Sequence, residues 1–304
     1  MQFLKIYTGI FLLLAFSAVS QSTLNSFLKP ADTLSLQRRN TVVITESALA
    51  GTSLLALNQL WYQSYEQSSF HTTNDSGEWL QMDKLGHVYS AYQLGRIGAE
   101  VLQWSGVSKK SQLWYGATLG FSYLTVIEIF DGFSKEWGFS WTDMLANATG
   151  ASLYIGQELL WKEQRVVLKY SFHQTAYASQ NPEKLGNGFL EEMLKDYNGQ
   201  TYWLSANVHS FFKSCKFPKW LNVALGYSGK GMLTGSKTEA VDNFIITPHR
   251  KRQLFLSLDV DLTKIETNSH VLKTIFSVFN VIKVPFPAVE FTDKNDIKLH
   301  GIYF

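Results

Sequence analysis

The chain has 304 residues, of which 45% are hydrophobic, 17% charged and 14% aromatic. This apolar content is sufficient for a packed core, so the composition excludes a disordered chain. The 27 basic and 25 acidic residues leave a formal net charge of +2 and are spread along the sequence. No dense basic surface is expected, which argues against a nucleic-acid partner. The single cysteine, Cys215, excludes an internal disulfide and a thiolate zinc site.

Residues 1–20 have the pattern of a secretory signal peptide. Lys5 is the only charged residue there, an apolar run covers 10–16, and the small residues Ala18 and Ser20 follow. A retained transmembrane helix is the weaker alternative because the apolar run is short. We therefore expect an exported protein of the periplasm or the outer membrane. No cysteine directly follows the apolar run. The sequence therefore departs from the pattern of a bacterial lipoprotein, in which such a cysteine carries the lipid.

The region 41–162 is expected to be helical, after a polar tether over 21–40. Strand signals are scarce in this region. Four segments have the length of a helix and are rich in small, aromatic and apolar residues. These segments are 41–63, 84–105, 112–131 and 141–161.

After residue 162 the sequence changes to shorter alternating segments, which are typical of strands separated by turns. The expected strands are 165–172, 202–208, 220–227, 253–261 and 297–304, with short helices at 188–196 and 270–282. The sequence thus predicts an α+β fold, in which an N-terminal four-helix bundle precedes a small antiparallel β-rich region with short helices over 163–304.

None of the four predicted helices is a clean apolar span. The second contains His87, Arg96 and Glu100, and the third contains Glu128. If all four crossed the inner membrane, the acidic loop 64–83 would be cytoplasmic, against the positive-inside bias. We therefore expect a largely periplasmic bundle that leans on a membrane, with an integral inner-membrane bundle as the alternative.

The second predicted helix carries polar residues on its apolar face. Asp83 and His87 are one turn apart and share a face with apolar residues such as Ala91. Gln93 and Arg96 fall on the opposite side, where a solvated stripe is expected. His87 is therefore expected to point into the bundle.

Three helix ends bring further polar residues to the same place. Glu128 and Asp131 lie at the end of the third predicted helix, and Asp143 and Asn147 lie at the start of the fourth. Glu128 occurs on an apolar face, so its carboxyl group is expected to be paired or protonated. We predict one polar cluster near an opening between helices. Its candidate catalytic residues are His87, Glu128 and Asp131, and its candidate binding residues are Asp83, Asp143 and Asn147.

Some of these residues also have a purely structural interpretation. Asp83 can be the N-cap of its helix, and Asp131 can belong to a turn after a helix end. The residues from Ser140 to Asp143 are typical of a capping box, with Asp in place of the usual Glu. His87, Glu128 and Asn147 are interior and are less easily explained in this way.

Three short blocks together resemble known families. They are Asp-Lys-Leu-Gly-His at 83–87, Glu-Ile-Phe-Asp-Gly-Phe-Ser at 128–134 and Trp-Gly-Phe-Ser-Trp-Thr-Asp-Met-Leu-Ala-Asn-Ala-Thr-Gly at 137–150. In this order they resemble the YfiM-like family of predicted periplasmic lipoproteins, whose function is unknown, and more distantly VanZ-like membrane proteins. The resemblance covers about 41–161. It implies an envelope protein with a candidate site, and it implies no particular reaction.

Other catalytic motifs are missing from the sequence. It has no Gly-x-Ser-x-Gly motif, no phosphate loop and no dinucleotide fingerprint, so no nucleotide cofactor is expected. Three further histidines are expected to face solvent: His173 and His209 in predicted strands, and His300 near the end of the chain.

Two main functions remain open, and a membrane or an envelope lipid is the expected partner in both. In the first, the helical module binds an envelope lipid or another apolar envelope ligand without catalysis. The second is a metal-assisted envelope lipid hydrolase or transferase, in which His87 acts as general base or metal ligand beside Glu128 and Asp131. Its cofactor would be a divalent metal with His87, Glu128 and Asp143 as candidate ligands, a set that suits Mg²⁺, Mn²⁺ or Ca²⁺ better than zinc. A purely structural role in the envelope is a third interpretation.

Overall fold

The computed structural model describes residues 23–60, 62–214, 216–236, 249–293 and 296–304. The predicted signal peptide and Cys215 lie outside the described residues. Within them, helices in the first half precede one large antiparallel sheet in the second half. This arrangement confirms the predicted α+β class.

Four helical stretches occur where the sequence predicts them. The first, α2 (Leu36–Leu60), begins earlier than expected, and residues 23–28 are helical as well, so the predicted tether is partly helical. The second and fourth are α3 (Met82–Trp104) and α6 (Trp141–Trp161). The third is interrupted, because α4 (Lys109–Ser111) and the π-helical turn η3 (Gln112–Gly116) precede α5 (Leu119–Gly132).

Small residues let α3 pack closely against its helical neighbours. Gly120 of α5 and Gly150 of α6 lie directly on the α3 backbone. A Cβ atom on Gly120 would meet the carbonyl oxygen of Ala91, and one on Gly150 would meet that of Val88. Interiors are packed too densely to absorb such an overlap without movement. The three helices α3, α5 and α6 therefore form a tight core.

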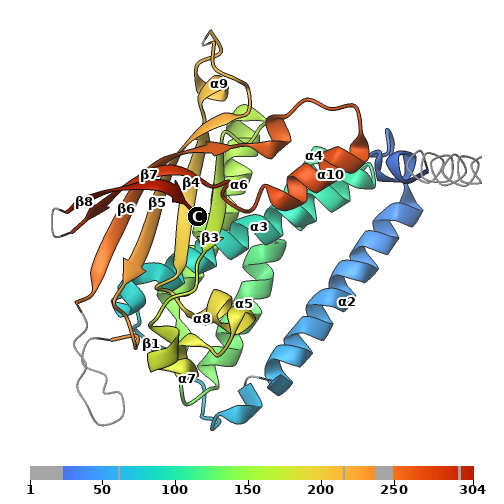
Figure 1. Ribbon diagram of the computed structural model, residues 1–304. Coiled ribbons are helices and arrows are strands. Elements are labelled where there is room, and N and C mark those ends of the chain that lie inside the picture. The colour runs from blue at the N-terminus through green and yellow to red at the C-terminus, as the bar shows by residue number, and fades with distance from the viewer. Residues whose placement is uncertain (1–22, 61, 215, 237–248, 294–295) are drawn as a thin grey trace, which may run out of the picture.

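The helix α2 has much less contact with this core. Large apolar residues along it, among them Ile44, Leu49 and Leu55, are exposed. Figure 1 shows α2 set apart from α3 and α5 along much of its length. The helical region is thus a compact group of three helices with α2 at its side, and this arrangement does not by itself establish a four-helix bundle.

Among the described residues, two helical stretches are long and apolar enough to cross a membrane. They are Leu36–Gln59 and Lys109–Gly132, each with a mean hydropathy of 1.2, and 6% and 33% of their most apolar windows are buried. Core helices of soluble proteins meet the same criteria. Length and composition alone therefore do not place either helix in a membrane.

The second half of the chain forms a six-stranded antiparallel sheet in which each strand pairs with the next one along the chain. The strands are β3 (Val166–Phe172), β4 (Gln200–Asn207), β5 (Leu221–Lys230), β6 (Lys251–Val260), β7 (Phe286–Thr292) and β8 (Ile297–Tyr303). Five of them confirm predicted strands. The sixth, β7, was not predicted, and Pro287 near its start is a residue that argues against a strand in a sequence.

The buried face of this sheet is unusually polar. Lys169 of β3 and Asp259 of β6 are completely buried and form an ion pair of 2.9 Å. Lys283 is also fully buried, and its Nζ lies 4.7 Å from the ring centre of Trp203. Many apolar side chains of the central strands β5 and β6 point the other way, into solvent.

Short elements connect the strands. The helices α8 (Phe189–Lys195) and α10 (His270–Phe279) confirm the two predicted short helices. The remaining elements are α7 (Pro182–Leu185), α9 (Val208–Phe211), η1 (Tyr62–Ser64), η2 (Glu78–Gln81), η4 (Ala178–Gln180) and η5 (Leu262–Lys264).

The histidines of this region agree with the predictions only in part. His209 lies in α9 and not in a strand, because Asn207 caps a new helical turn by accepting the Ser210 backbone N–H. His173 follows directly after β3 and is exposed, as predicted. His300 does lie in a strand, but it is partly buried and its Nε2 is 2.7 Å from Glu290 Oε2.

The prediction of a solvated stripe on the side of α3 opposite His87 is wrong at Gln93 and Arg96. Gln93 is buried and donates to the carbonyl oxygen of Leu168 in β3, and Arg96 is buried and donates to Ser277 of α10. The sheet and α10 cover this polar face. Periodicity shows which residues share a face, but it does not show what that face contacts.

We expect Gly150→Ala to lower the free energy of unfolding by about 1–3 kcal/mol, because its Cβ would overlap the α3 backbone at Val88. Gly156→Ala in the same helix is the matched control, since nothing lies within 4 Å of its Cβ position. Helix propensity should make the control neutral, or stabilising by up to about 1 kcal/mol. Urea unfolding of both variants measures the difference, and equal effects would contradict the close contact.

Candidate functional site

A two-stranded pairing brings the loop before α3 to the start of α6. β1 (Thr72–Thr73) pairs in parallel with β2 (Phe139–Ser140), so Asp75 lies beside Ser140. The Ser140 hydroxyl donates to Asp75 Oδ1 at 2.7 Å. The Ser140 Oγ also accepts the backbone N–H of Asp143 at 3.1 Å, as the N-cap of α6. The serine half of the predicted capping box is therefore present.

The ammonium group of Lys84 lies among three carboxylates. Its Nζ is 2.5 Å from Asp75 Oδ2, 2.9 Å from Asp83 Oδ2 and 2.8 Å from Asp143 Oδ1. Asp143 is thus drawn to Lys84 and does not close the capping box with a bond back to Ser140. One cation connects the loop before α3, α3 itself and α6.

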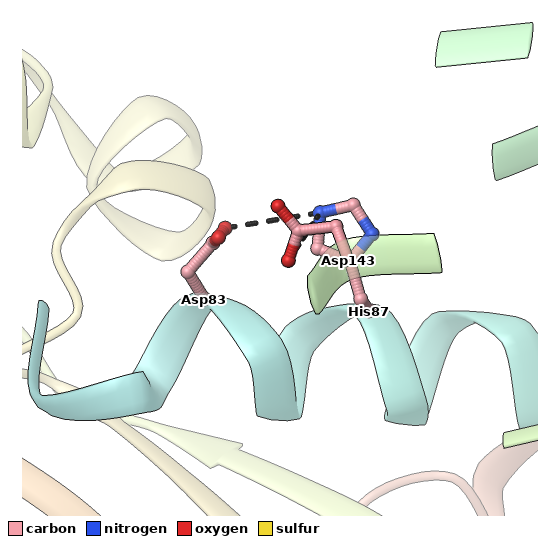
Figure 2. A group of neighbouring side chains, drawn as sticks. All are labelled: Asp83, His87 and Asp143. Atoms are coloured by element: carbon pink, nitrogen blue, oxygen red, sulfur yellow. Dashed lines mark ion pairs between the residues drawn. The ribbon is translucent and has the colours of Figure 1, made fainter. Parts of the chain in front are cut away.

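His87 lies one turn after Asp83 on α3 and faces Asp143 (Figure 2). Its Nδ1 is 3.0 Å from Asn147 Oδ1. Because an amide oxygen only accepts, Nδ1 carries the hydrogen of this bond. Its Nε2 is 3.6 Å from Glu128 Oε1, 3.8 Å from Asp83 Oδ1 and 4.0 Å from Asp143 Oδ1. One imidazole therefore faces three carboxyl groups.

We call Asp75, Asp83, Lys84, His87, Glu128, Asp143 and Asn147 the polar cluster. Five of them are the predicted site residues other than Asp131. Glu128 is almost completely buried, and its Oε2 accepts the backbone N–H of Ser140 at 3.2 Å. The structure thus brings together residues from three helix ends, as the sequence predicts.

Asp83 and Asp131 do not have the structural roles considered for them. Asp83 lies within the first turn of α3, whose N-cap position is occupied by Gln81. Asp131 lies in the last turn of α5, which continues to Gly132, and its Oδ1 accepts the Tyr62 hydroxyl at 2.6 Å. In the described part of the chain no ion pair joins Asp131 to the polar cluster, so it lies beside the cluster.

Burial changes the proton affinity of the acids at this site. It raises the pKa of Glu128 to about 8, although the neighbouring His87 acts in the opposite direction. Burial and the charge of Asp83 raise the pKa of Asp143 to about 7, and burial raises the pKa of Asp131 to about 6. Burial would also raise the pKa of Asp75, but hydrogen bonds from Lys84 and Ser140 lower it to about 2.

The charges of the polar cluster nearly compensate one another at neutral pH. Burial disfavours the charged form of His87, but the charges of Asp83, Asp143 and Glu128 outweigh it and raise the pKa. The positive charges of His87 and Lys84 overcome burial in the same way and lower the pKa of Asp83. Both shifts favour the charged forms of His87 and Asp83, beside the ion pair of Lys84 with Asp75. Buried charges are tolerated only when they are paired like this.

One pocket connects the polar cluster with the surface. It has a volume of about 280 Å³ and lies between α3, α5, α8, β3 and β4. Asp83 and His87 form a polar end. Much of its wall is aromatic and comes from Tyr89, Tyr170, Tyr197 and Tyr202.

Three side chains of the polar cluster could hold a metal ion. Asp83, His87 and Asp143 each offer one ligand atom, and these atoms lie within 4.8 Å of one another. Asp83 takes the place that the sequence analysis assigns to Glu128. The ammonium group of Lys84 already contacts both aspartates, so a metal ion would have to displace it or bind beside it.

Sequence reasoning missed Asp75, Lys84 and Tyr197. Lys84 lies inside the block 83–87, so the signal was present but its role was not assigned. Asp75 reaches the cluster only through the β1–β2 pairing. Tyr197 donates to Asp83 Oδ1 at 2.8 Å from a segment more than a hundred residues away in the chain, and no pattern in the helical region predicts that contact.

The comparison with known families supports an envelope protein. Residues 70–156 match a family described as "Predicted periplasmic lipoprotein (DUF2279)". This stretch runs from just before β1 into α6 and contains every residue of the polar cluster. It agrees with the expected location, which is export to the periplasm or association with the outer membrane. No curated protein and no solved structure matches the chain.

The raised pKa of Glu128 predicts a pH dependence of stability. Its carboxyl group binds a proton more tightly in the folded chain, with a pKa of about 8, than at its ordinary value of 4.5. The folded state therefore holds more protons between these values. This contribution to stability is complete below about pH 4.5 and is lost as the pH rises through about 8, and the raised pKa of His87 acts with the same sign.

We expect Glu128→Gln to make stability fall less steeply between pH 5 and pH 8, by up to about 1.4 kcal/mol per pH unit. Urea unfolding at several pH values measures the slope. Glu183→Gln on the exposed surface of α7 is the control and should keep the wild-type slope. Parallel curves for Glu128→Gln and the wild type would contradict a protonated Glu128.

Proposed function

We propose that this chain is an envelope protein whose helical module binds an envelope lipid or another apolar ligand that has a polar group. The pocket is the observation that carries the proposal, because it joins Asp83 and His87 to a wall of aromatic and apolar side chains. Pockets of this kind take ligands that are mostly apolar and are oriented by a few polar contacts.

The polar end has hydrogen-bonding capacity to offer. His87 Nε2 has no hydrogen-bond partner among the described residues, because its three carboxyl neighbours are 3.6–4.0 Å away. A polar ligand group at the His87 end of the pocket would supply the hydrogen-bond partner that Nε2 lacks.

The aromatic wall is held in place before any ligand arrives. The rings of Tyr89, Tyr170 and Tyr202 pack together with centroids 5.5–5.7 Å apart. Each hydroxyl donates to another group of the protein, and two of these bonds go to the backbone of Val281 and Met193. A preformed surface binds without ordering cost, which favours affinity.

The proposal includes α2 as a fourth helix of the module. A second cavity of about 870 Å³ separates α2 from α3 and η3. Its lining is largely apolar and includes Val43 of α2, Leu102 of α3 and Tyr115 of η3. A space of this size and character could hold the acyl part of a lipid, which supports a four-helix module closed around apolar material.

The proposal also includes a relationship to two more narrowly defined families. The order of the three sequence blocks supports kinship with YfiM-like proteins and, more distantly, with VanZ-like membrane proteins. Neither likeness brings a known reaction, so the function rests on the pocket.

A metal-assisted lipid hydrolase or transferase is the second candidate. It is favoured by the convergence of Asp83, His87 and Asp143 within 4.8 Å. In this interpretation His87 is the general base or a ligand, and Glu128 is its carboxylate partner. Asp131 would act from the neighbouring turn, at the side where Tyr62 holds it.

Filling the pocket should abolish ligand binding. Ser90 lines the pocket, and we expect Ser90→Phe to weaken binding of the soluble short-chain lipid dihexanoyl phosphatidylglycerol at least about tenfold, because the ring occupies its space. Ser179→Phe at an exposed position of η4 is the control and should bind like the wild type. Isothermal titration measures affinity, and circular dichroism confirms folding. Equal affinity of all three proteins would reject the pocket as the binding site.

Metal content separates the two candidate functions. Because Lys84 already neutralises Asp83 and Asp143, we expect less than one equivalent of divalent metal in protein purified without chelator. Elemental mass spectrometry of the wild type, His87→Ala, Asp143→Asn and the neighbouring Asp131→Asn measures it. Stoichiometric metal that is lost in the first two variants and kept in Asp131→Asn would favour the hydrolase or transferase.

A further inference from the structure

One face of the large sheet presents apolar side chains to solvent. In β5 and β6 the exposed positions are Val223, Leu225, Leu254, Leu256 and Leu258, each between 40% and 50% exposed. Apart from Phe255, the buried positions between them are polar or small, such as Asn222, Ala224, Ser257 and Asp259. An antiparallel sheet with one solvent-exposed face normally shows the opposite alternation, with apolar residues on the buried face and polar residues on the exposed face.

Strand register gathers these side chains into one continuous surface. Leu204 of β4 lies opposite Leu225, Leu225 opposite Leu256, Leu256 opposite Val289 and Val289 opposite Leu299 of β8. A second row runs from Leu254 through Phe291 to Ile297. We call this surface the outer sheet face. A contiguous apolar patch of this kind marks an interaction surface, whereas scattered exposed leucines do not.

A basic and aromatic connection adjoins the outer sheet face. The segment 208–220 links β4 to β5 and, as Figure 1 shows, projects beyond one end of the sheet at α9. Its exposed aromatic residues are Phe211, Phe212, Phe217 and Trp220. It contains Lys213, Lys216 and Lys219 and no acidic residue, and all three lysines are exposed. Lys219 forms an exposed ion pair with Glu266 at 2.6 Å.

This combination matches a lipid surface. Apolar side chains gain by leaving water for acyl chains, aromatic residues favour the region between water and lipid, and lysines are attracted to anionic headgroups. Sheets that contact lipid carry apolar residues outward and polar residues inward, which is the alternation of β5 and β6. A protein partner would explain the apolar rows, but it would not by itself require a lysine-rich, acid-free edge.

We propose that the outer sheet face, together with the segment 208–220, docks the protein on an anionic phospholipid surface. The apolar rows contact the acyl region, and Lys213 and Lys216 contact the headgroups. The outer sheet face and the pocket at His87 consist of different residues. An experiment can therefore reject membrane docking without rejecting ligand binding in the pocket, and the reverse.

Vesicle flotation of the full chain tests the docking. The probes are vesicles of phosphatidylethanolamine and phosphatidylglycerol, compared with vesicles of phosphatidylcholine alone. We expect the wild type to float with the anionic vesicles and to dissociate as salt is raised. Leu225→Gln/Leu256→Gln should reduce partitioning at least about tenfold, from the apolar area lost. The control is Leu159→Gln/Leu160→Gln, which replaces two exposed leucines of α6 outside the outer sheet face. This variant should partition like the wild type.

The lysines have their own matched control. Lys213→Gln/Lys216→Gln should reduce partitioning to anionic vesicles by about tenfold and leave that to phosphatidylcholine unchanged. Lys110→Gln/Lys273→Gln removes the same charge from other exposed positions and should have no effect. Circular dichroism and dihexanoyl phosphatidylglycerol titration verify that the variants keep their fold and pocket.

Two results would overturn the proposal. One is equal flotation of the wild type and all four variants. The other is a wild-type dimer in solution that Leu225→Gln/Leu256→Gln dissociates, without any flotation of the wild type, which would make the outer sheet face an interface between two copies.

Discussion

The site depends on one buried cation. Lys84 contacts Asp75, Asp83 and Asp143, which come from the loop before α3, from α3 and from α6. Without its ammonium group, these carboxylates would repel one another at one end of the three helices, which glycine contacts hold close together at Val88 and Ala91. Charge compensation at Lys84 therefore lets the helix ends converge, and that convergence places His87 against Glu128 and Asn147.

The two halves of the chain are joined at the same point. The tyrosine wall of the pocket comes mainly from the sheet and from the segment after α8, whereas its polar end comes from α3. The Tyr197 hydroxyl donates to Asp83 and thereby links the wall directly to the polar cluster. The ligand that we propose would thus contact both halves, and the outer sheet face would orient the same assembly on a lipid surface.

The errors of the sequence analysis have a common physical cause. Gln93 and Arg96 lie on a polar face of α3, but β3 and α10 cover that face and supply its hydrogen bonds. His209 follows a strand whose last residue, Asn207, caps a helical turn. The strands β5 and β6 alternate as expected, but alternation does not reveal that their more polar side is the buried one. In each case the local pattern is correct and the contact partner is unknown.

The sequence by itself determined the α+β class, the four helical stretches, five of the six large strands and five residues of the polar cluster. These follow from periodicity and from spacing along a helix, which are local properties of the chain. Only the tertiary structure decided that Asp75 and Tyr197 join the site, that Lys84 neutralises it and that Asp131 stays beside it. These features depend on which backbone segments lie side by side. Contacts between segments far apart in the chain produce no periodic pattern in a single sequence.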